Sequence, residues 1–269
     1  MATLKEHMEE ITIALENGIK AVFDTDRFRG WLEFMGKFPT YSFRNQIICF
    51  MSNPAAEYFC GMKQWNKDFH RTVIKGQHPI WILAPIFKKV KEKDENGEEV
   101  EITKLVGYKP VMVYGDNQTT GDPLPSICKQ LEGKVNDYTA LVDKITAYAP
   151  CSVSFGDARG ANGYYSPTED RIVVAEGMSE KQTLKTLIHE TAHSILHRKG
   201  AEEENTNRRR KETEAEAVAY AVCSYLGIDT GDYSFEYLAS WASGRELKEL
   251  QECLTVIQST ACSFIKAVA

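Results

Sequence analysis

The stretch TLIHETAHSILH, residues 186–197, carries three of the six histidines of the chain, each four residues from the next. His189, Glu190 and His193 form an HExxH pattern. Residues four apart lie one turn apart on the same face of a helix, so two imidazoles with this spacing can bind one zinc ion. Glu190 points away from the pair and can act as general base on water that zinc activates for attack on a carbonyl. The pattern therefore predicts a zinc-dependent hydrolytic site.

The HExxH pattern lies in the middle of a predicted helix. Ser179 begins that helix as part of a capping box, SEKQ, with Gln182 placed to reach back to the cap. Apolar residues at helical spacing give the helix a core-facing stripe: Leu184, Leu187, Ile188, Ala192 and Ile195. Two short strands, CSVSF and RIVVA, precede the helix, and the second closes a hairpin over YYSPTED. The alternative, histidines that merely pack or cap, fits this context less well than a metal site.

A third ligand must come from outside the pattern. His197 lies two turns from His189, about 12 Å along the axis, and is too far to share that ion. It is expected at the helix end or behind the ligands. The longer pattern HExxHxxGxxH also fails, because Leu196 and Lys199 occupy its glycine and third-histidine positions.

The next predicted helix, KETEAEAVAYAVCSYLG, offers three glutamates. Glu214 falls on its small, apolar face, where a carboxylate is costly unless something neutralises it, and zinc would do so. Glu214 is therefore favoured as third ligand, with Glu216 next. Glu212 and Glu216 are expected to point sideways or into solvent. Gly227 is expected to end the helix.

Composition narrows the class of protein. The chain has 269 residues, enough for one large or two modest domains, and it contains no run of 18 apolar residues, which disfavours a membrane span. The N-terminal sequence MATLKEHMEEITIALENG is typical of a helix and not of a signal peptide. Seven scattered cysteines without a CxxC pair indicate buried thiols in a reducing cytoplasm.

The charge is unevenly distributed. Residues 37–91 carry a net charge of +7, whereas residues from 126 onward carry −5. The first half is predicted to contain helices over 4–38 and from 42 to before Pro54, followed by strands over 80–90 and 109–115 around an Asn-Gly hairpin tip. The turn-rich sequence DNQTTGDPLPS is the expected domain boundary. A helix over about 127–148 opens the second half, and two helices are expected after residue 227. Together these elements predict an α+β fold.

The positive region also interleaves aromatic and basic residues. Such a surface can hold a single nucleic acid strand, because aromatic rings stack on bases while cations contact phosphates. The aromatic and basic residues in question are Tyr41, Trp65, Phe69, Trp81, Arg44, Lys63, Lys67, Arg71 and Lys75. Trp81 is expected in the core, and for Trp65 both stacking and a core position remain open. The lysines that follow Phe87 suit a solvated hairpin.

HETAHSILH followed by ETEAEAVAYAV resembles the zincin domain of ImmA/IrrE-like and ArdC-like proteins. That resemblance implies His189 and His193 as zinc ligands, Glu190 as catalytic base and Glu214 as third ligand. One position departs from the pattern: many relatives have Asn or Asp four residues after the ligand glutamate, where this chain has Val218. The hydrogen bond to the metal site that this residue would make must come from another group.

Three further segments resemble the N-terminal domain of ArdC-like antirestriction proteins, which is associated with binding single-stranded DNA. They are YSFRNQ, which contains Tyr41, Arg44 and Asn45, the segment GMKQWNKDFHRTVIKGQHPIWILAP, and VMVYGDNQTTGDPLP with its Q-T-x-G-x-P-L-P ending. The resemblance implies a protein of a mobile genetic element that protects DNA from restriction during conjugation.

The sequence thus predicts two domains, residues 1–124 for single-stranded DNA and residues 125–269 as a zincin-like metallopeptidase, in a cytoplasmic protein. Two alternatives remain: an antirestriction protein with a silent zinc site, and a regulatory peptidase that cleaves a repressor. An intact Glu190 argues against a purely structural metal, which needs no base. The peptidase substrate and the oligomeric state do not follow from the sequence.

Overall fold

A computed structural model describes residues 4–93, 99–124, 138–200, 208–228, 235, 238 and 242–269. Contacts divide the chain into two compact units. The first consists of Met1–Gly18 and Arg44–Leu124, and the second of Ile19–Phe43 and Pro125–Ala269. Residues 19–43, expected in the first domain, therefore pack with the second unit. Both units combine helices and strands, and the fold is α+β as predicted.

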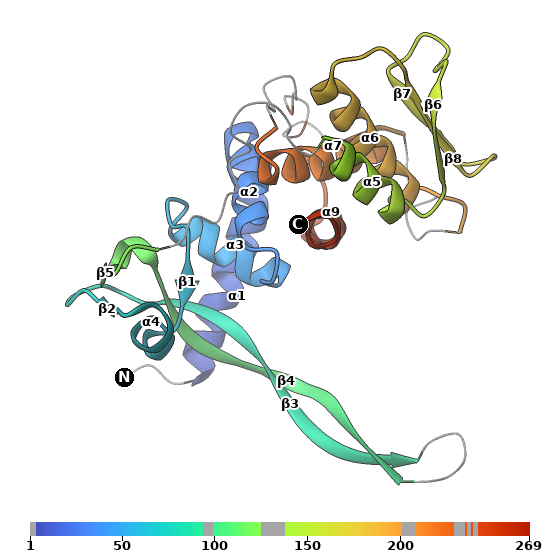
Figure 1. Ribbon diagram of the computed structural model, residues 1–269. Helices are drawn as coiled ribbons and strands as arrows, with labels where there is room; N and C mark the ends of the chain where they lie inside the picture. Colours follow the sequence, from blue (N-terminus) through green and yellow to red (C-terminus); the bar gives the residue numbers. More distant parts are fainter. Residues whose placement is uncertain are drawn as a thin grey trace. The chain divides into compact units, whose positions relative to one another are not determined.

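The first unit is built on a long β-hairpin (Figure 1). Its elements are α1 (Leu4–Ala21, whose last turn belongs to the second unit), α3 (Phe43–Ser52), β1 (Phe59–Cys60), α4 (Met62–Phe69), β2 (Arg71–Val73), β3 (Ile80–Lys93), β4 (Glu99–Gly115), η1 (Asp116–Gln118) and β5 (Thr119–Gly121). β3 and β4 pair antiparallel from Ile80–Val113 to Lys93–Glu99, with a bulge between Ile86 and Phe87. The expected Asn-Gly tip lies outside the described residues.

Three short strands complete the sheets of this unit. β1 pairs with the end of β4, and β2 pairs antiparallel with β5. The second pairing brings the segment after Trp65 against the turn-rich sequence that follows η1. These two segments are far apart in sequence, and hydrogen bonds from the Arg71 side chain hold them together.

The second unit contains five helices and a small mixed sheet within its described residues. The elements are α2 (Thr25–Lys37), α5 (Tyr138–Tyr148), β6 (Ser152–Gly156), β7 (Gly163–Ser166), β8 (Arg171–Ala175), α6 (Glu180–Leu196), α7 (Arg208–Tyr225) and α9 (Leu247–Val268). The predicted hairpin is present as β7–β8, while β6 runs parallel to β8 on its other side. The expected start of α5 and most of the segment between α7 and α9 lie outside the described residues.

Helix α6 is positioned by its cap and by its apolar stripe. Ser179 Oγ accepts a hydrogen bond from the backbone N–H of Gln182 at 3.3 Å, as the capping box predicts. The Gln182 side chain donates to Thr186 instead of reaching back to the cap. Leu184, Leu187 and Ile188 are fully buried, and α6 packs against β7, β8 and α7. This packing fixes which face of α6 remains accessible.

Helix α7 crosses the centre of the second unit. It packs against α6, α2 and α9, and its alanines allow close approach. Tyr220 donates a hydrogen bond to Glu33 of α2 at 2.7 Å, and Phe28 of α2 packs edge-on against Phe235. The helix ends at Tyr225, and Gly227 follows with a φ of 68°, the left-handed conformation expected of a terminating glycine. None of the described helices is long and apolar enough to cross a membrane.

Candidate metal centre

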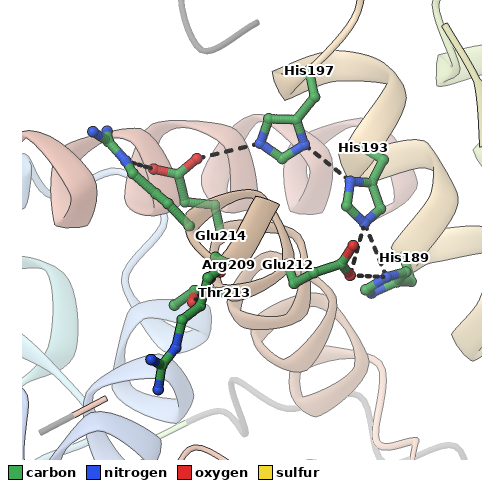
Figure 2. Close-up of polar contacts among 8 residues, drawn as sticks. His189, His193, His197, Arg209, Glu212, Thr213 and Glu214 are labelled. Carbon is green, nitrogen blue, oxygen red and sulfur yellow. Dashed lines mark hydrogen bonds and ion pairs between the residues drawn. The ribbon is translucent and has the colours of Figure 1, made fainter. Parts of the chain in front are cut away.

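Helices α6 and α7 bring two histidines and a glutamate together. His189 and His193, one turn apart on α6, place their Nε2 atoms 3.1 Å from each other. Glu212 Oε2, in the first turns of α7, lies 3.8 Å from His189 Nε2 and 3.4 Å from His193 Nε2. Figure 2 shows the three side chains pointing at one position. The HExxH spacing therefore produces the geometry that it predicts.

The three groups fit a divalent metal ion. Tetrahedral zinc with bonds of 2.0–2.1 Å separates its ligand atoms by about 3.3 Å, close to the observed distances. Contacts with the two histidines hold the pKa of the Glu212 carboxyl well below its usual range, so the carboxylate is ionised and able to coordinate. Two neutral imidazoles and one carboxylate, with a fourth position open, form the ligand set of catalytic zinc sites.

Glu214, the residue favoured from sequence as third ligand, faces a different group. It is fully buried, as predicted. Its Oε2 lies 3.3 Å from His197 Nε2, and its Oε1 accepts a hydrogen bond from Arg210 Nε at 2.6 Å. Arg210 therefore neutralises the buried carboxylate of Glu214, whereas zinc was expected from sequence to do so. The structure thus brings Glu212, and not Glu214, to the histidine pair.

His197 links Glu214 to His193, one of the candidate metal ligands. His197 Nδ1 lies 3.0 Å from His193 Nδ1, which completes a chain from Glu214 through His197 to His193 (Figure 2). A His193 that ligates through Nε2 carries its proton on Nδ1, and that proton is donated to His197. His197 then carries its own proton on Nε2 and donates it to Glu214. One assignment of tautomers therefore satisfies both hydrogen bonds, from His193 to His197 and from His197 to Glu214.

From sequence the third ligand was expected on the most apolar face of α7, whereas Glu212 lies at the border of that face. A hydrolytic metal must remain open to substrate, so its ligands lie at the edge of a packed face and not at its centre. Glu212 and Glu216, one turn apart, both line cavities beside the histidines. A glutamate pair at i and i+4 on the border of the apolar stripe was the available sequence signal.

Glu190 lies between two cavities of the second unit. One, of about 320 Å³, is bounded by Asn162, Lys185 and Glu216, and the other, of about 640 Å³, extends past Tyr165 to His193. Both are lined by His189 and Glu190. Burial raises the pKa of Glu190, against the opposing effects of His189 and a backbone hydrogen bond involving Tyr165. A raised pKa brings the carboxylate nearer to the value that suits a general base at neutral pH.

Strand β7 forms one wall of this cleft and is an edge of its sheet, whose order is β6-β8-β7. Gly163 begins the strand and lies against Thr186 and Glu190 of α6. A Cβ there would lie 2.5 Å from Thr186 Cγ2 and 3.5 Å from Glu190 Cγ, so only glycine fits without movement. An edge strand beside the candidate centre can pair with an extended peptide through its backbone.

Three residues expected at a DNA surface have structural roles in the first unit. Trp65 is fully buried, and its Nε1 donates to the Tyr114 carbonyl at 3.0 Å. Of the two alternatives for Trp65, the structure gives the core position. Asn45 is also buried and exchanges two hydrogen bonds with the backbone of Leu83, at 2.8 and 3.0 Å.

Arg71 is committed to the turn after η1. Its guanidinium donates to the Thr119 side chain at 2.8 Å and to the carbonyls of Thr119 and Asp122. This network fixes β2 to β5, which corrects the expectation that Arg71 lines a DNA groove. The remaining basic candidates are exposed: Arg44, Lys63, Lys67 and Lys75. Tyr41 is half-buried in the second unit, where its carbonyl accepts a hydrogen bond from Gln258.

Comparison with known families identifies the class of the second unit. Residues 151–224 match the family model of the IrrE N-terminal-like domain, an M78 peptidase family. The matched segment contains β6 to α7 and therefore every residue of the candidate centre. This segment of the second unit is accordingly similar to the IrrE N-terminal-like domain.

The whole fold is similar to that of solved antirestriction proteins. The metal-free structure of the antirestriction protein ArdC from the R388 plasmid has a TM-score of 0.55 and 21% identity, covering 85% of this chain and 84% of ArdC. Its Mn(II)-bound structure has a TM-score of 0.52 at the same identity, covering 85% and 83%. The resemblance to ArdC-like proteins is thus confirmed at the level of the fold.

A curated relative is an uncharacterized protein of Bacillus anthracis, 26% identical over 87% of this chain. The chain spans 46% of the length of that relative. The shared region therefore represents less than half of the longer protein.

Proposed function

We propose that the second unit is a zinc-dependent peptidase and that the first unit binds single-stranded DNA, in a protein with an antirestriction role on a mobile genetic element. The peptidase proposal is carried by one observation: His189, His193 and Glu212 converge at a point beside Glu190, in a cleft walled by an edge strand. The proposed ligand set is therefore His189, His193 and Glu212.

The residues of the site divide the work of peptide hydrolysis. Bound zinc would supply Lewis acidity, which polarises a carbonyl and lowers the pKa of water. β7 would hold the substrate extended through backbone hydrogen bonds. Glu190 would accept the proton of the attacking water and deliver it to the leaving amine, since its side chain is half-buried and its pKa is raised.

Metal content and turnover of the full chain test this proposal together. Wild-type protein should bind about one zinc, and Glu190→Gln should keep the metal while losing hydrolysis of a casein-type substrate by at least about 100-fold, the lower range for lost general-base catalysis. Glu212→Ala should lose the metal, and Glu216→Gln is the matched control that should keep it. Equal metal content in the Glu212 and Glu216 variants would exclude Glu212 as ligand.

The DNA-binding proposal is supported by the charge of the first half and by the exposed cations. Lys63 and Lys67 lie one turn apart on α4 and are both exposed. Replacing either with Ala should weaken binding of all single strands alike and reduce the salt dependence by about one unit, as expected for one lost phosphate contact. Unaltered salt dependence in both variants would remove α4 from the DNA surface.

The two alternatives predict different results in the same assays. A silent zinc site would keep the metal and the DNA binding but show no Glu190-dependent hydrolysis. A regulatory peptidase would cleave one specific protein and leave casein intact.

A further inference from the structure

A second concave site lies in the first unit, separate from the metal centre. This cavity has a volume of about 640 Å³, within the range of small-molecule sites. One wall is α1, with Glu10, Ile11 and Ala14, and another is the end of α3 with Asn53. The remaining walls come from residues 77–81 and from η1.

Two of the segments that carry the ArdC-like resemblance meet at this cavity. GQHPIW contributes Gln77 and Trp81, and GDNQTTG contributes Asn117 and Gln118. Trp65 and Arg71, from the segment that contains Gln77 and Trp81, have structural roles, and these roles do not explain the four residues that line the cavity. Because the four residues line one cavity, binding of a ligand there would be a function that they share.

Side-chain amides hold the wall in a defined position. Asn53 and Asn117 exchange two hydrogen bonds, at 2.7 and 3.0 Å. Gln118 accepts from the Gly115 N–H at 2.8 Å and donates to the His78 carbonyl at 2.8 Å. Gly115 permits this closeness, because a Cβ there would lie 2.6 Å from Asn53 Nδ2. The site is therefore formed before any ligand arrives.

The chemistry of the lining favours a neutral, planar ligand with its own donors and acceptors. Ile11, Ile48 and Ile80 are buried and give an apolar surface. In the reciprocal pair, each amide retains a second N–H and a second lone pair. Among the described lining residues there is no Lys or Arg, and Glu10 adds a carboxylate, which disfavours an isolated phosphate.

We propose that this cavity receives an unpaired nucleobase of the single strand bound by the first unit. On the outer edge of the Asn53–Asn117 pair, the second N–H of one amide lies beside the second lone pair of the other, so the pair together offers a base one donor and one acceptor, and the apolar wall contacts the ring. The phosphates would remain outside, toward the exposed Lys75 that lies two residues before Gln77. This inference rests on the proposed DNA binding and specifies which part of the strand enters the protein.

The test uses the full chain and two labelled twelve-nucleotide strands, one normal and one with abasic sites throughout. Ala14→Trp fills the cavity from an exposed position of α1, and Ile13→Trp places the same ring at a neighbouring position that is 59% exposed and not among the lining residues. Fluorescence anisotropy at fixed salt gives the affinities. Ala14→Trp should weaken the normal strand about tenfold, a typical loss for one stacked base, and leave the abasic strand unchanged. Ile13→Trp should match wild type on both.

A second variant probes the amide edge. Asn117→Asp keeps an oxygen for the Asn53 N–H, but it loses both the hydrogen bond to Asn53 Oδ1 and the outward N–H. It should therefore weaken the normal strand more than the abasic strand, and a thermal melt checks that the first unit stays folded.

Three results would overturn the inference. The first is that Ala14→Trp binds the normal strand as well as wild type does, and the second is that Ala14→Trp weakens both strands equally. The third is that Ala14→Trp loses binding to a labelled unstructured peptide while its affinity for the oligonucleotides is intact, which would assign the cavity to a peptide. Wild-type protein that binds neither strand would instead refute the proposed DNA binding, and the base pocket with it.

Discussion

Replacing His197 with phenylalanine removes the acceptor for His193 Nδ1 while keeping a ring of similar size at a position only 4% exposed. The His193 N–H then has no partner, and leaving a buried donor unsatisfied costs about 1–3 kcal/mol. That range corresponds to a metal affinity lowered about 10- to 100-fold, the usual effect of removing a group that orients a ligand histidine. His193 also loses the contact that fixes its tautomer.

His197→Asn is the matched control. Its side-chain oxygen can take the place of the imidazole Nδ1 as acceptor, so this variant should recover part of the lost affinity. Glu214→Gln should give a smaller loss, about tenfold, because a neutral hydrogen bond replaces a charge-assisted one and the two differ by roughly 1–1.5 kcal/mol. The order of affinities should therefore be wild type, then Glu214→Gln and His197→Asn, then His197→Phe.

Zinc affinity is measured on dialysed protein by competition with a chromogenic chelator, and a thermal melt of the metal-free form reports folding. The absorption spectrum of the Co(II)-substituted protein reports ligand geometry independently. Equal affinity of His197→Phe and wild type, both folded, would show that His193 needs no support from His197. Equal losses in His197→Phe and His197→Asn would reduce the role of His197 to packing.

Three other changes test other parts of the structure. Trp65→Ala should lower the free energy of unfolding by about 3–5 kcal/mol, as for a large buried ring; a small change in chemical denaturation would return Trp65 to the DNA surface. Gly163→Ala should reduce peptidase activity while zinc remains bound, because the new methyl group pushes β7 from Thr186; full activity would show that the wall tolerates movement. Burial raises the pKa values of Cys49 and Cys60 to about 12, so at pH 8 roughly one thiol in 10,000 is ionised and native protein should resist iodoacetamide there, whereas rapid alkylation would indicate local opening.

Local periodicity was enough to predict the helix with the HExxH residues, its Ser179 cap and the β7–β8 hairpin, because each depends on neighbouring residues. The third ligand depends on how α6 and α7 cross. Residues 212 and 214 point in nearly opposite directions on a helix, so the assumed orientation of α7 decides which of the two glutamates is placed beside the histidine pair. Trp65 shows the same limit: aromatic and basic residues alternate both on a DNA surface and around a small core, and only its burial distinguishes the two.

The placement of α2 could not be predicted for a related reason. The apolar face of α2, with Phe28 and Trp31, indicates that the helix is packed against other elements. It does not identify those elements. Its partners α7 and α9 lie about 180 or more residues further along the chain, and no local signal spans that separation.

Residues 19–43 belong to the second unit although the segments on both sides of them in sequence belong to the first, and this has a consequence for biosynthesis. The chain crosses between the units at residues 18–19, 43–44 and 124–125, so α2 leaves the ribosome long before the helices that cover it. Residues 44–124 can complete their hairpin meanwhile, since their pairings are local to that segment. The apolar face of α2 must wait for α7 and α9, and domains that need such late partners expose aggregation-prone surface during synthesis. The second unit can therefore cover α2 only when α9 has emerged, and a ribosome that stops early releases a chain whose α2 still exposes its apolar face.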